Sequence, residues 1–404
     1  AYEIYQCDWS SDVCSSDLLS ATTTSLTYNP STPASTALQI SGGSGTGAVT
    51  VGVGAGEPCS VALSGGIWTL TSSGAGTCHV SATRAADANY QSMAASALVV
   101  TVAKASATLT FDSTSKTVQF GAAFTGPTAS TNSTASIVYS SSDTSVATVN
   151  SSTGAVTIVG VGSTTISAQA PTNANYLAST TVSYVLNVTA VPQSLTWNAA
   201  TNGLTSKAFG DTFTIGATSS AGLTPTYSAS GGCSISGNQV TMTSGVTNCV
   251  ISANQSGNAT TASASPITKT ITATLMAQPM LDVSASALNL TFNPITPEQV
   301  TVTATGGAGT GTLRYSLRAG DNCSISVAGD VATVTINGAG VCRVSAQRVA
   351  DANYLASNVA SVDISVARAL GVITVGTPPG AVTFGAGVTP PIAGINSEIG
   401  RAHV

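Results

Sequence analysis

The sequence has few charged residues, few aromatic residues and few histidines, and these shortages exclude several classes of function. Only 7% of its 404 residues are charged and 5% are aromatic, and the whole chain has two histidines. Its 11 Lys and Arg residues form no basic stripe of the kind that binds nucleic acid. No apolar run approaches the ~20 residues needed to span a bilayer. We therefore expect no nucleic-acid partner and no membrane insertion within this chain.

Candidate catalytic groups are equally scarce. A Ser-His-Asp triad would need His79, which stands beside Cys78 on a predicted strand with one polar face and is better explained as a surface histidine. The glycine-rich turns Gly42–Gly47 and Gly306–Gly311 lack the Lys and the following helix of a phosphate-binding loop. The sequence therefore predicts no catalytic residue, no cofactor and no metal site, and we expect that the protein is not an enzyme.

What the chain does contain is an internal repeat. The phrase Ala-Asp-Ala-Asn-Tyr occurs at Ala86–Tyr90 and Ala350–Tyr354, with a looser copy at Thr172–Tyr176. A second marker, an aromatic opener, comes early in each unit, at Tyr28, Phe111, Trp197 and Phe292, in steps of 83, 86 and 95 residues. A period this long indicates a tandem array of small domains, each with its own core, rather than a solenoid.

The markers predict four complete repeats and a truncated fifth. Short boundaries without long Gly/Ser linkers predict that neighbouring domains stack closely, as a monomeric rod. The predicted ranges are 19–103 for repeat 1, 104–189 for repeat 2, 190–276 for repeat 3, 277–368 for repeat 4 and 369–397 for the truncated repeat 5.

Within a repeat the pattern is strand, turn, strand. In repeat 1, Cys59–Leu63, Ile67–Thr71, Thr77–Thr83 and Ala97–Val102 are short Val-, Ile- and Thr-rich runs bounded by Gly, Ser and Asn. No window of helical length has a 3.6-residue period. About seven such strands in about ninety residues predict an all-β fold, a tandem array of immunoglobulin-like β-sandwich domains.

The cysteines indicate where the domains are cross-linked. Outside the first eighteen residues they form three local pairs, each inside one repeat, while repeat 2 has Thr144 and Thr164 at the corresponding places. Joint absence of both members favours disulfides, and a zinc site would need four Cys or His ligands. Disulfides imply an oxidising compartment, so we expect an exported protein. The predicted disulfides are Cys59–Cys78, Cys233–Cys249 and Cys323–Cys342.

Three stretches carry a family resemblance. Gly74–Tyr90 and Gly338–Tyr354 resemble the closing half of bacterial Ig-like repeats, and Thr144–Ala168 is similar to the group-2 bacterial Ig-like pattern of intimin- and invasin-type adhesins. The resemblance covers roughly 19–397 and implies a secreted or cell-surface protein. Repeat 3 departs from it at Ser256–Thr261, where the Asn-Tyr phrase is missing, so we expect a differently shaped loop there.

The two ends of the chain differ from the rest. Residues 1–18 and 398–404 match the translation of a common short-read sequencing adapter, and we interpret both as non-native segments that flank a metagenomic fragment of a longer gene. Without them ten basic and eleven acidic residues remain, so the net charge changes from −5 to −1. The acidic character of the whole chain is an effect of its ends.

The repeated phrase itself has several interpretations. Asp87, Asp351, Asn89 and Asn353 have oxygens that suit Ca²⁺ at a domain junction, but the same side chains cap their own turns. We expect Tyr90, Tyr176 and Tyr354 to cover the ends of the sandwiches with the ring buried; glycan stacking is the alternative. For Trp68 and Trp197 we expect core positions.

These observations predict a non-enzymatic extracellular stalk or spacer of a bacterial surface or secreted protein, which projects a module outside this chain. One alternative is an adhesive module that binds a host-surface protein or glycan. The other is a set of accessory repeats of a secreted carbohydrate-active enzyme.

Overall fold

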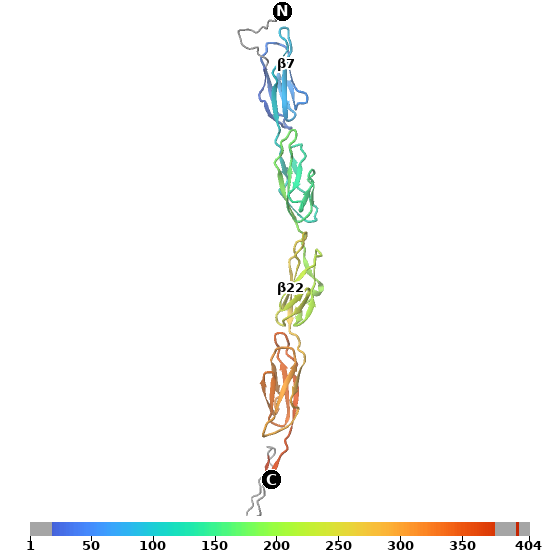
Figure 1. Ribbon diagram of the computed structural model, residues 1–404, viewed down its shortest axis with the longest axis vertical. Helices are drawn as coiled ribbons and strands as arrows, with labels where there is room; N and C mark the ends of the chain where they lie inside the picture. Colours follow the sequence, from blue (N-terminus) through green and yellow to red (C-terminus); the bar gives the residue numbers. More distant parts are fainter. Residues whose placement is uncertain (1–17, 376–392, 396–404) are drawn as a thin grey trace, which may run out of the picture. The chain divides into compact units, whose positions relative to one another are not determined.

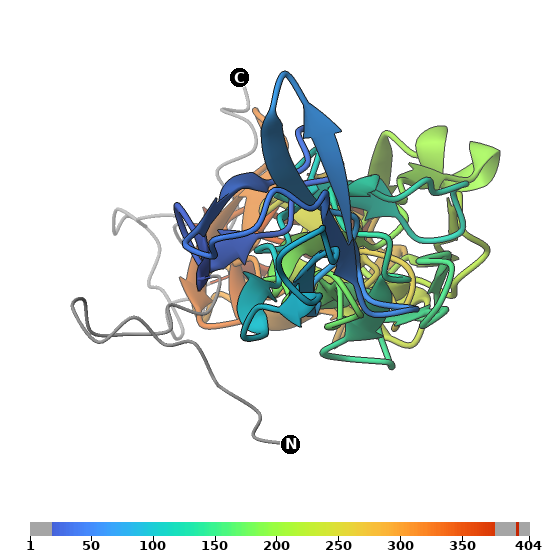
Figure 2. The same ribbon diagram turned by 90° about the horizontal axis from the view of Figure 1, so that it is seen from above.

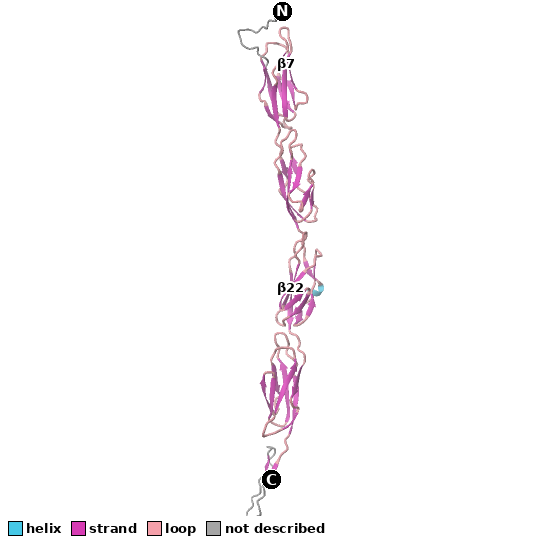
Figure 3. Ribbon diagram, in the orientation of Figure 1, coloured by secondary structure: helices cyan, strands magenta, loops and turns pink. Residues whose placement is uncertain are grey.

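The computed structural model describes residues 18–375 and 393–395. The two predicted adapter-derived segments, apart from Leu18, and most of the truncated repeat 5 lie outside these residues. The chain divides into two compact units, Ala1–Pro192 with Gly257–Ala262, and Gln193–Ser256 with Ser263–Val404. Almost all regular structure is strand (Figures 1 and 3). The predicted all-β, immunoglobulin-like array is confirmed.

Repeat 1, in the first unit, is a sandwich of one antiparallel sheet and one mixed sheet, in which β2 pairs in parallel. Polar and apolar residues alternate along each strand, so the apolar side chains of each sheet lie on the face that points toward the other sheet. One sheet has the order β1(Leu18–Ala21), β3(Ser35–Ser41), β6(Ile67–Ser72), β5(Cys59–Ser64). The other has the order β2(Ser25–Thr27), β9(Leu98–Ala103), β7(Gly76–Arg84), β4(Val49–Val53), with β8(Met93–Ala94) beside β7. The β5–β6 hairpin is the blue pair of arrows prominent in Figure 2.

Repeat 2 completes the first unit with shorter strands. Its main sheet has the order β11(Ser115–Gln119), β17(Val182–Thr189), β16(Gly162–Gln169), β13(Val138–Ser141). Two small antiparallel pairs accompany it, β10(Leu109–Phe111) with β12(Ala129–Thr131), and β14(Ala147–Val149) with β15(Val156–Ile158).

Repeat 3 belongs mainly to the second unit. Its sheets are β19(Ser206–Ala208), β26(Ile267–Thr274), β25(Cys249–Asn254), β22(Thr226–Gly231); then β20(Thr212–Thr214), β24(Gln239–Met242), β23(Cys233–Ser236); and the pair β18(Leu195–Trp197) with β21(Ala217–Ser219). A four-residue helix that periodicity could not reveal, α1(Ala199–Asn202), begins at Asn198, whose side chain accepts a hydrogen bond from the N–H of Thr201.

Repeat 4 repeats the two-sheet plan of repeat 1. One sheet is β27(Leu281–Ala285), β29(Gln299–Gly306), β32(Val331–Ile336), β31(Cys323–Ala328). The other is β28(Asn289–Thr291), β34(Ala360–Ala367), β33(Gly340–Arg348), β30(Leu313–Leu317). Beyond them, β35(Ile373–Val375) pairs with β36(Ala393–Ile395).

The expected strands of repeat 1 lie within one residue of β5, β6, β7 and β9, but the repeat has more strands than the seven expected. One reason is that its first extended segment serves both sheets, and the other is the short strand β8 beside β7. Leu18–Ala21 pairs antiparallel with β3, and after a bend Ser25–Thr27 pairs in parallel with β9. Repeat 4 divides its first segment in the same way, between β29 and β34. A single extended segment therefore forms an edge strand in both sheets.

Each repeat has its own apolar core. The openers Tyr28, Phe111, Trp197 and Phe292 are half-buried and pack against the cores of their own repeats. Trp68 likewise packs half-buried on the core of repeat 1. Trp68 and Trp197 therefore lie at the border of the core, half-buried, rather than fully inside it.

Disulfides connect the two sheets of three repeats. Cys59 and Cys78 join β5 to β7, Cys233 and Cys249 join β23 to β25, and Cys323 and Cys342 join β31 to β33. In repeat 2 the buried hydroxyl of Thr164 accepts a hydrogen bond of 2.9 Å from the N–H of Asp143 and lies 2.9 Å from the Ser141 hydroxyl. In repeat 2, hydrogen bonds to Thr164 therefore hold β16 at the place where repeats 1, 3 and 4 have a disulfide. Thr144, at the place of the other cysteine, is exposed.

Replacing both Cys59 and Cys78 by Ala is expected to destabilise repeat 1 by about 3 kcal/mol, because the bond closes a loop in the unfolded chain. The measurement is hydrogen exchange of the β7 amides at increasing urea concentrations. Repeat 2 is the internal control, since it has no cysteine, and its β16 amides should not change. Equal protection of β7 with and without the disulfide would contradict the prediction.

Candidate functional site

The repeated phrase forms the same turn in every complete repeat. A side-chain Oδ1 at its first Asp or Asn accepts hydrogen bonds from the N–H groups two and three residues later, as Asx side chains do. The acceptors are Asp87, to Asn89 and Tyr90 (2.8 and 2.9 Å); Asn173, to Asn175 and Tyr176 (2.9 and 2.8 Å); Asn258, to Thr260 and Thr261 (both 2.9 Å); and Asp351, to Asn353 and Tyr354 (both 2.8 Å). We call these four turns the Asx loops.

The Asx loop of repeat 3 corrects an expectation from the sequence. The missing Asn-Tyr phrase suggested a different shape, but Asn258 makes the same bonds, and its own N–H donates to the carbonyl of Thr261 over 2.9 Å. The corresponding bond from Asp87 to Tyr90 is also 2.9 Å. The turn depends on the Asx oxygen and not on the tyrosine, so Thr261 stands where the other repeats have an aromatic ring.

In repeats 1 and 4 the second carboxylate oxygen holds the glycine-rich turn. Asp351 Oδ2 accepts from the N–H of Thr310 at 2.5 Å and from its hydroxyl at 3.2 Å, and Asp87 Oδ2 makes the same two bonds to Thr46. Glycine allows the close approach, because a Cβ at Gly311 would lie 2.0 Å from the carbonyl oxygen of Val349. The N–H groups of Thr46 and Thr310 in these turns donate to a carboxylate, which would repel a phosphate.

These bonds lower the pKa of both carboxyl groups. Backbone N–H donation, from Asn89 first and then from Thr46 and Tyr90, lowers the pKa of Asp87 to about 2. Donation from Asn353 first, then Tyr354, lowers the pKa of Asp351 to about 2. The donors neutralise the lone pairs that a cation would need, so the Ca²⁺ interpretation finds no free carboxylate oxygen at either loop.

The Asx loop of repeat 2 joins it to repeat 1 within the first unit. Asn175 Oδ1 accepts a hydrogen bond of 2.8 Å from the N–H of Ala75, in the turn before β7. The ring of Tyr176 meets the opener Tyr28 edge to face, with centroids 5.7 Å apart. Ala105, in the linker, donates to the carbonyl of Asn175 at 2.9 Å and accepts from the N–H of Leu177 at 2.8 Å. A parallel β-bridge therefore fixes the linker to the loop.

The Asx loop of repeat 4 joins it to repeat 3 in the same way, within the second unit. Asn353 Oδ1 accepts from the N–H of Gly245 at 3.0 Å, and Tyr354 meets Phe209 with centroids 5.5 Å apart. The linker residue Met276 donates to the carbonyl of Asn353 at 2.8 Å and accepts from the N–H of Leu355 at 2.9 Å. We call these two contact sets the joints. Each has a side-chain hydrogen bond, an aromatic pair and a bridged linker.

The linker before repeat 3 shares one element of the joints. Val191 donates to the carbonyl of Thr260 and accepts from the N–H of Ala262, both at 2.9 Å. The bridge is parallel and pairs Val191 with Thr261. Because this bridge uses only backbone groups, it is present in repeat 3 although the side chains of the phrase differ there.

The three tyrosines have different surroundings. Tyr176 is 3% exposed, Tyr354 is half-buried, and Tyr90 is 50% exposed. The expectation of a buried ring holds for Tyr176 and is wrong for Tyr90. The ring does not cover its own sandwich. Tyr176 meets the opener Tyr28 and Tyr354 meets Phe209, each in the preceding repeat, and no described ring plays that part for Tyr90.

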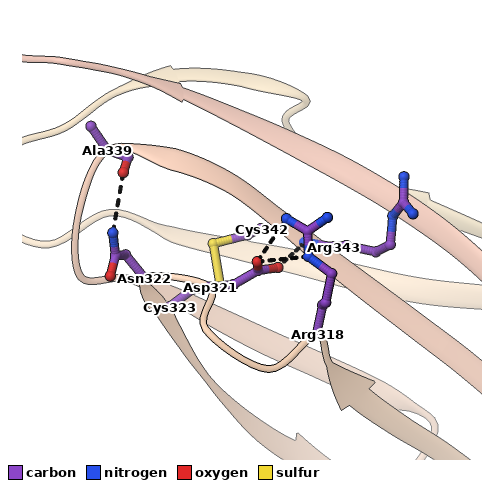
Figure 4. The surroundings of a disulfide bond; sticks show 7 residues. All are labelled: Arg318, Asp321, Asn322, Cys323, Ala339, Cys342 and Arg343. Atoms are coloured by element: carbon purple, nitrogen blue, oxygen red, sulfur yellow. Dashed lines mark hydrogen bonds and ion pairs between the residues drawn. A yellow bond between two sulfur atoms is a disulfide. The ribbon is translucent and has the colours of Figure 1, made fainter.

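The disulfides have acidic neighbours that repeat between domains. Asp321 accepts from the N–H of Arg343 at 2.7 Å and pairs with the guanidinium of Arg318 at 3.0 Å (Figure 4). The Arg343 N–H bond, followed by the Arg318 contacts, lowers the pKa of Asp321. Arg343 also forms a two-pronged ion pair with Asp363, with both distances 2.7 Å.

The equivalent corner of repeat 1 contains His79. Its Nδ1 lies 2.7 Å from Glu57 Oε1, and its N–H donates to Glu57 Oε2 at 2.6 Å. The hydrogen bond with the imidazole, and then the one with the N–H, lowers the pKa of Glu57. The side chain of His79 is 58% exposed, which agrees with a surface histidine. Glu57 and Asp321 occupy matching positions two residues before the first cysteine, so the pair belongs to the frame of the domain.

One group of metal-ligating residue types occurs in the described part of the chain. It consists of Glu57, Cys59 and Cys78. The two sulfurs are bonded to each other, and a disulfide has no thiolate for a metal. Within the described residues, no helix has the length and apolar character needed to cross a membrane.

Comparisons with known proteins identify no family. No family model matches, and no curated protein matches. Among solved structures, the chain is similar to Protocadherin Gamma B7 extracellular cadherin domains 1–4, with TM-score 0.32, 9% identity and coverage of 79% of this chain and 92% of that one.

It is also similar to Drosophila N-cadherin EC1-4, with TM-score 0.24, 12% identity and coverage of 80% and 93% of the two chains. For domains 1–6 of the surface layer protein SbsC the TM-score is 0.20, the identity 14% and the coverage 93% and 58%. Likeness at this level has no bearing on function, which has to rest on the geometry of the chain itself.

Sequence reasoning found the Asx loops but missed half of each joint. Ala75, Gly245 and the linker residues Ala105 and Met276 carry no side-chain signal, because they act through backbone N–H and C=O groups. Asn175 and Asn353 were seen, but as turn or cation residues. Their recurrence two positions after the Asx oxygen was the available signal for a second role.

Replacing Asp351 by Asn is expected to release the glycine-rich turn while keeping the Asx loop. The amide retains one acceptor oxygen, as in Asn173 and Asn258, but loses Oδ2 as acceptor for Thr310. Acid acts in the same direction. A carboxyl group whose pKa is about 2 in the folded state, against an ordinary value of 3.8, stabilises the fold above pH 4 and loses this contribution as the pH falls through 2.

The measurements are a carbon-13 NMR titration of the Asp351 carboxyl and hydrogen exchange of the Thr310 and Asn353 amides. Asp351→Asn should reduce protection at Thr310 and retain it at Asn353. An Asp351 titration near its ordinary value, or unchanged Thr310 protection in the variant, would be the opposite result.

Tyr176 and Tyr90 form a matched pair for testing the joint. Tyr176→Ala should destabilise repeat 2 by about 3 kcal/mol, since it removes a buried ring and leaves a cavity between repeats. Tyr90→Ala removes an exposed ring and should change stability by less than about 0.5 kcal/mol. Hydrogen exchange of the β16 and β7 amides reports the two effects. Equal losses would show that both rings act within their own domains.

Proposed function

We propose that the protein is a non-enzymatic extracellular spacer of a bacterial surface or secreted protein, which projects a module that is not in this chain. The observation that carries the proposal is the recurrence of one joint. The same side-chain oxygen, the same edge-to-face ring contact and the same bridged linker join repeat 1 to repeat 2 and repeat 3 to repeat 4.

Such a joint suits a spacer, which has to keep its domains in a fixed arrangement in order to maintain its length. A flexible linker lets neighbouring domains reorient freely, whereas two backbone bonds at Ala105 align the linker with the loop that it reaches. Each net hydrogen bond contributes about 0.5–1.5 kcal/mol, and an aromatic pair contributes a similar amount. Together they favour one arrangement of the two repeats over the many that a free linker would allow.

The surface chemistry supports a mechanical role rather than catalysis. His79 is engaged by Glu57 on an exposed strand, and Asp87 and Asp351 are held ionised by turn N–H groups. These groups stabilise local structure, and they are spread over separate corners of separate repeats. General acid-base catalysis needs a side chain that is free to exchange a proton with a substrate and has a pKa near the working pH.

The disulfides support an extracellular location. Three bonds of the same type, each between the two sheets of one repeat, form and persist in an oxidising compartment. They also limit how far a repeat lengthens under tension, because the closed loop of 16 or 19 residues stays closed. A limit on extension suits a spacer, and it is also compatible with a binding module.

Small-angle scattering of the full chain tests the spacer. We expect a maximum dimension several times the cross-section, because stiffly joined domains add their lengths. The double variant Asn175→Ala/Tyr176→Ala should broaden the distribution of distances without unfolding repeat 2, and Asn89→Ala/Tyr90→Ala is the matched control that should leave the scattering unchanged. A compact wild-type particle, or indifference to the first variant, would contradict the proposal.

The adhesive alternative predicts a different result. An array of host matrix proteins and glycans would then show saturable binding of the chain to one ligand class. Such binding, lost on substitution of loop residues that make no joint, would replace the spacer by a binding module. Accessory repeats of a carbohydrate-active enzyme would bind a polysaccharide in the same assay.

A further inference from the structure

We propose that the Asx loop of repeat 1 is an unfilled joint, and that its occupant is the closing end of a further repeat of the same fold, attached ahead of Leu19. The inference rests on the proposed spacer function and deepens it by identifying the surface through which the array continues. We call this surface the open socket. It consists of Asp87, Asn89, Tyr90 and the backbone of Gln91.

The open socket has the geometry of the two filled joints. Asp87 holds the turn with the same pair of bonds as Asn173 and Asp351, so Asn89 and Tyr90 correspond to Asn175 with Tyr176 and to Asn353 with Tyr354. The loop is built independently of any occupant, because all of its internal bonds come from repeat 1. A preformed surface of this kind loses little conformational entropy on docking.

The contacts that define a joint are missing from the open socket. In the filled joints the Asn carbonyl accepts from a linker N–H, and the residue after the tyrosine donates to the same linker residue. Among the residues that the structure describes, the carbonyl of Asn89, its side-chain amide and the N–H of Gln91 have no such partner. Tyr90 is 50% exposed, whereas Tyr176 is 3% exposed.

The chemistry of these groups specifies the occupant. An extended segment has to offer one N–H and one C=O in parallel register, as Ala105 and Met276 do. A turn N–H has to reach Asn89 Oδ1, as those of Ala75 and Gly245 reach the neighbouring asparagines. An aromatic ring has to meet Tyr90 edge to face. The closing end of a repeat presents all three at once, and a glycan or a small ligand has no extended backbone with which to form the bridge.

The register can be read from the chain. Repeats 1 and 4 align with a constant offset of 264 residues, from Cys59 to Cys323 and from Asp87 to Asp351. Leu19 therefore corresponds to Val283, and the place of Met276 falls seven residues before Leu19, in the segment 1–17 that we interpret as non-native. A second copy of residues 193–282 placed directly before Leu19 puts its Met276 at the required position.

Hydrogen exchange of this extended chain tests the inference. In the chain as it is, the N–H of Gln91 should exchange without protection, while the equivalent amides of Leu177 and Leu355 are protected. In the extended chain, protection at Gln91 should rise to within about tenfold of that at Leu355. Thiol labelling, which the Cys233–Cys249 disulfide of the added copy would block, verifies that the copy has folded.

Two variants of the extended chain serve as controls. Met276→Pro in the added copy removes the N–H that would bond to Asn89, and Tyr90→Ala removes the ring contact. Both should reduce the gain at Gln91 and leave Leu177 and Leu355 unchanged.

Unchanged exchange at Gln91 beside a folded added repeat would overturn the inference, and so would protection that already exists in the unextended chain. Protection that increases with chain concentration would assign the socket to a second copy instead. Loss of protection at Leu177 and Leu355 would instead count against the spacer function. The experiment therefore distinguishes failure of the open-socket proposal from failure of the spacer proposal.

Discussion

One interaction underlies the ends of all four repeats: an Asx oxygen that accepts two backbone N–H groups of its own loop. It holds three consecutive residues in place, so that a carbonyl, a side-chain amide and a ring face outward together. In repeats 2 and 4 these groups meet the preceding repeat, and in repeat 1 they remain exposed. The same loop thereby forms a turn within its own domain and attaches that domain to the preceding one.

The loop also explains why the repeats tolerate so much variation. Asp and Asn exchange freely as the acceptor, since one oxygen suffices for the turn. Asp is used where Thr46 or Thr310 needs a second acceptor, and Asn173 uses its amide to donate to Thr134 over 3.0 Å instead. Repeat 3 has no tyrosine and keeps the bridge to Val191, because that bridge belongs to the backbone. Stabilisation of the sandwich varies likewise, with hydrogen bonds to Thr164 in repeat 2 where the other repeats have a disulfide.

The low charge of the chain is consistent with this design. The ion pairs at Glu57 with His79 and around Asp321 and Arg343 lie beside disulfides, where they hold the strand that contains the second cysteine. The carboxylates of the loops are satisfied by N–H groups rather than by cations.

The sequence by itself determined the repeat, the sandwich, four strands of repeat 1 to within a residue and the pairing of the cysteines. These follow from local signals: alternation, turn residues and the spacing of like side chains. Only the tertiary structure decided what the Asn-Tyr phrase does. Its partners Ala75, Gly245, Ala105 and Met276 act through backbone groups that every residue type possesses, so no pattern marks them. The burial of Tyr176 and the exposure of Tyr90 have the same cause, since an identical ring in an identical loop is buried or exposed according to what precedes its domain.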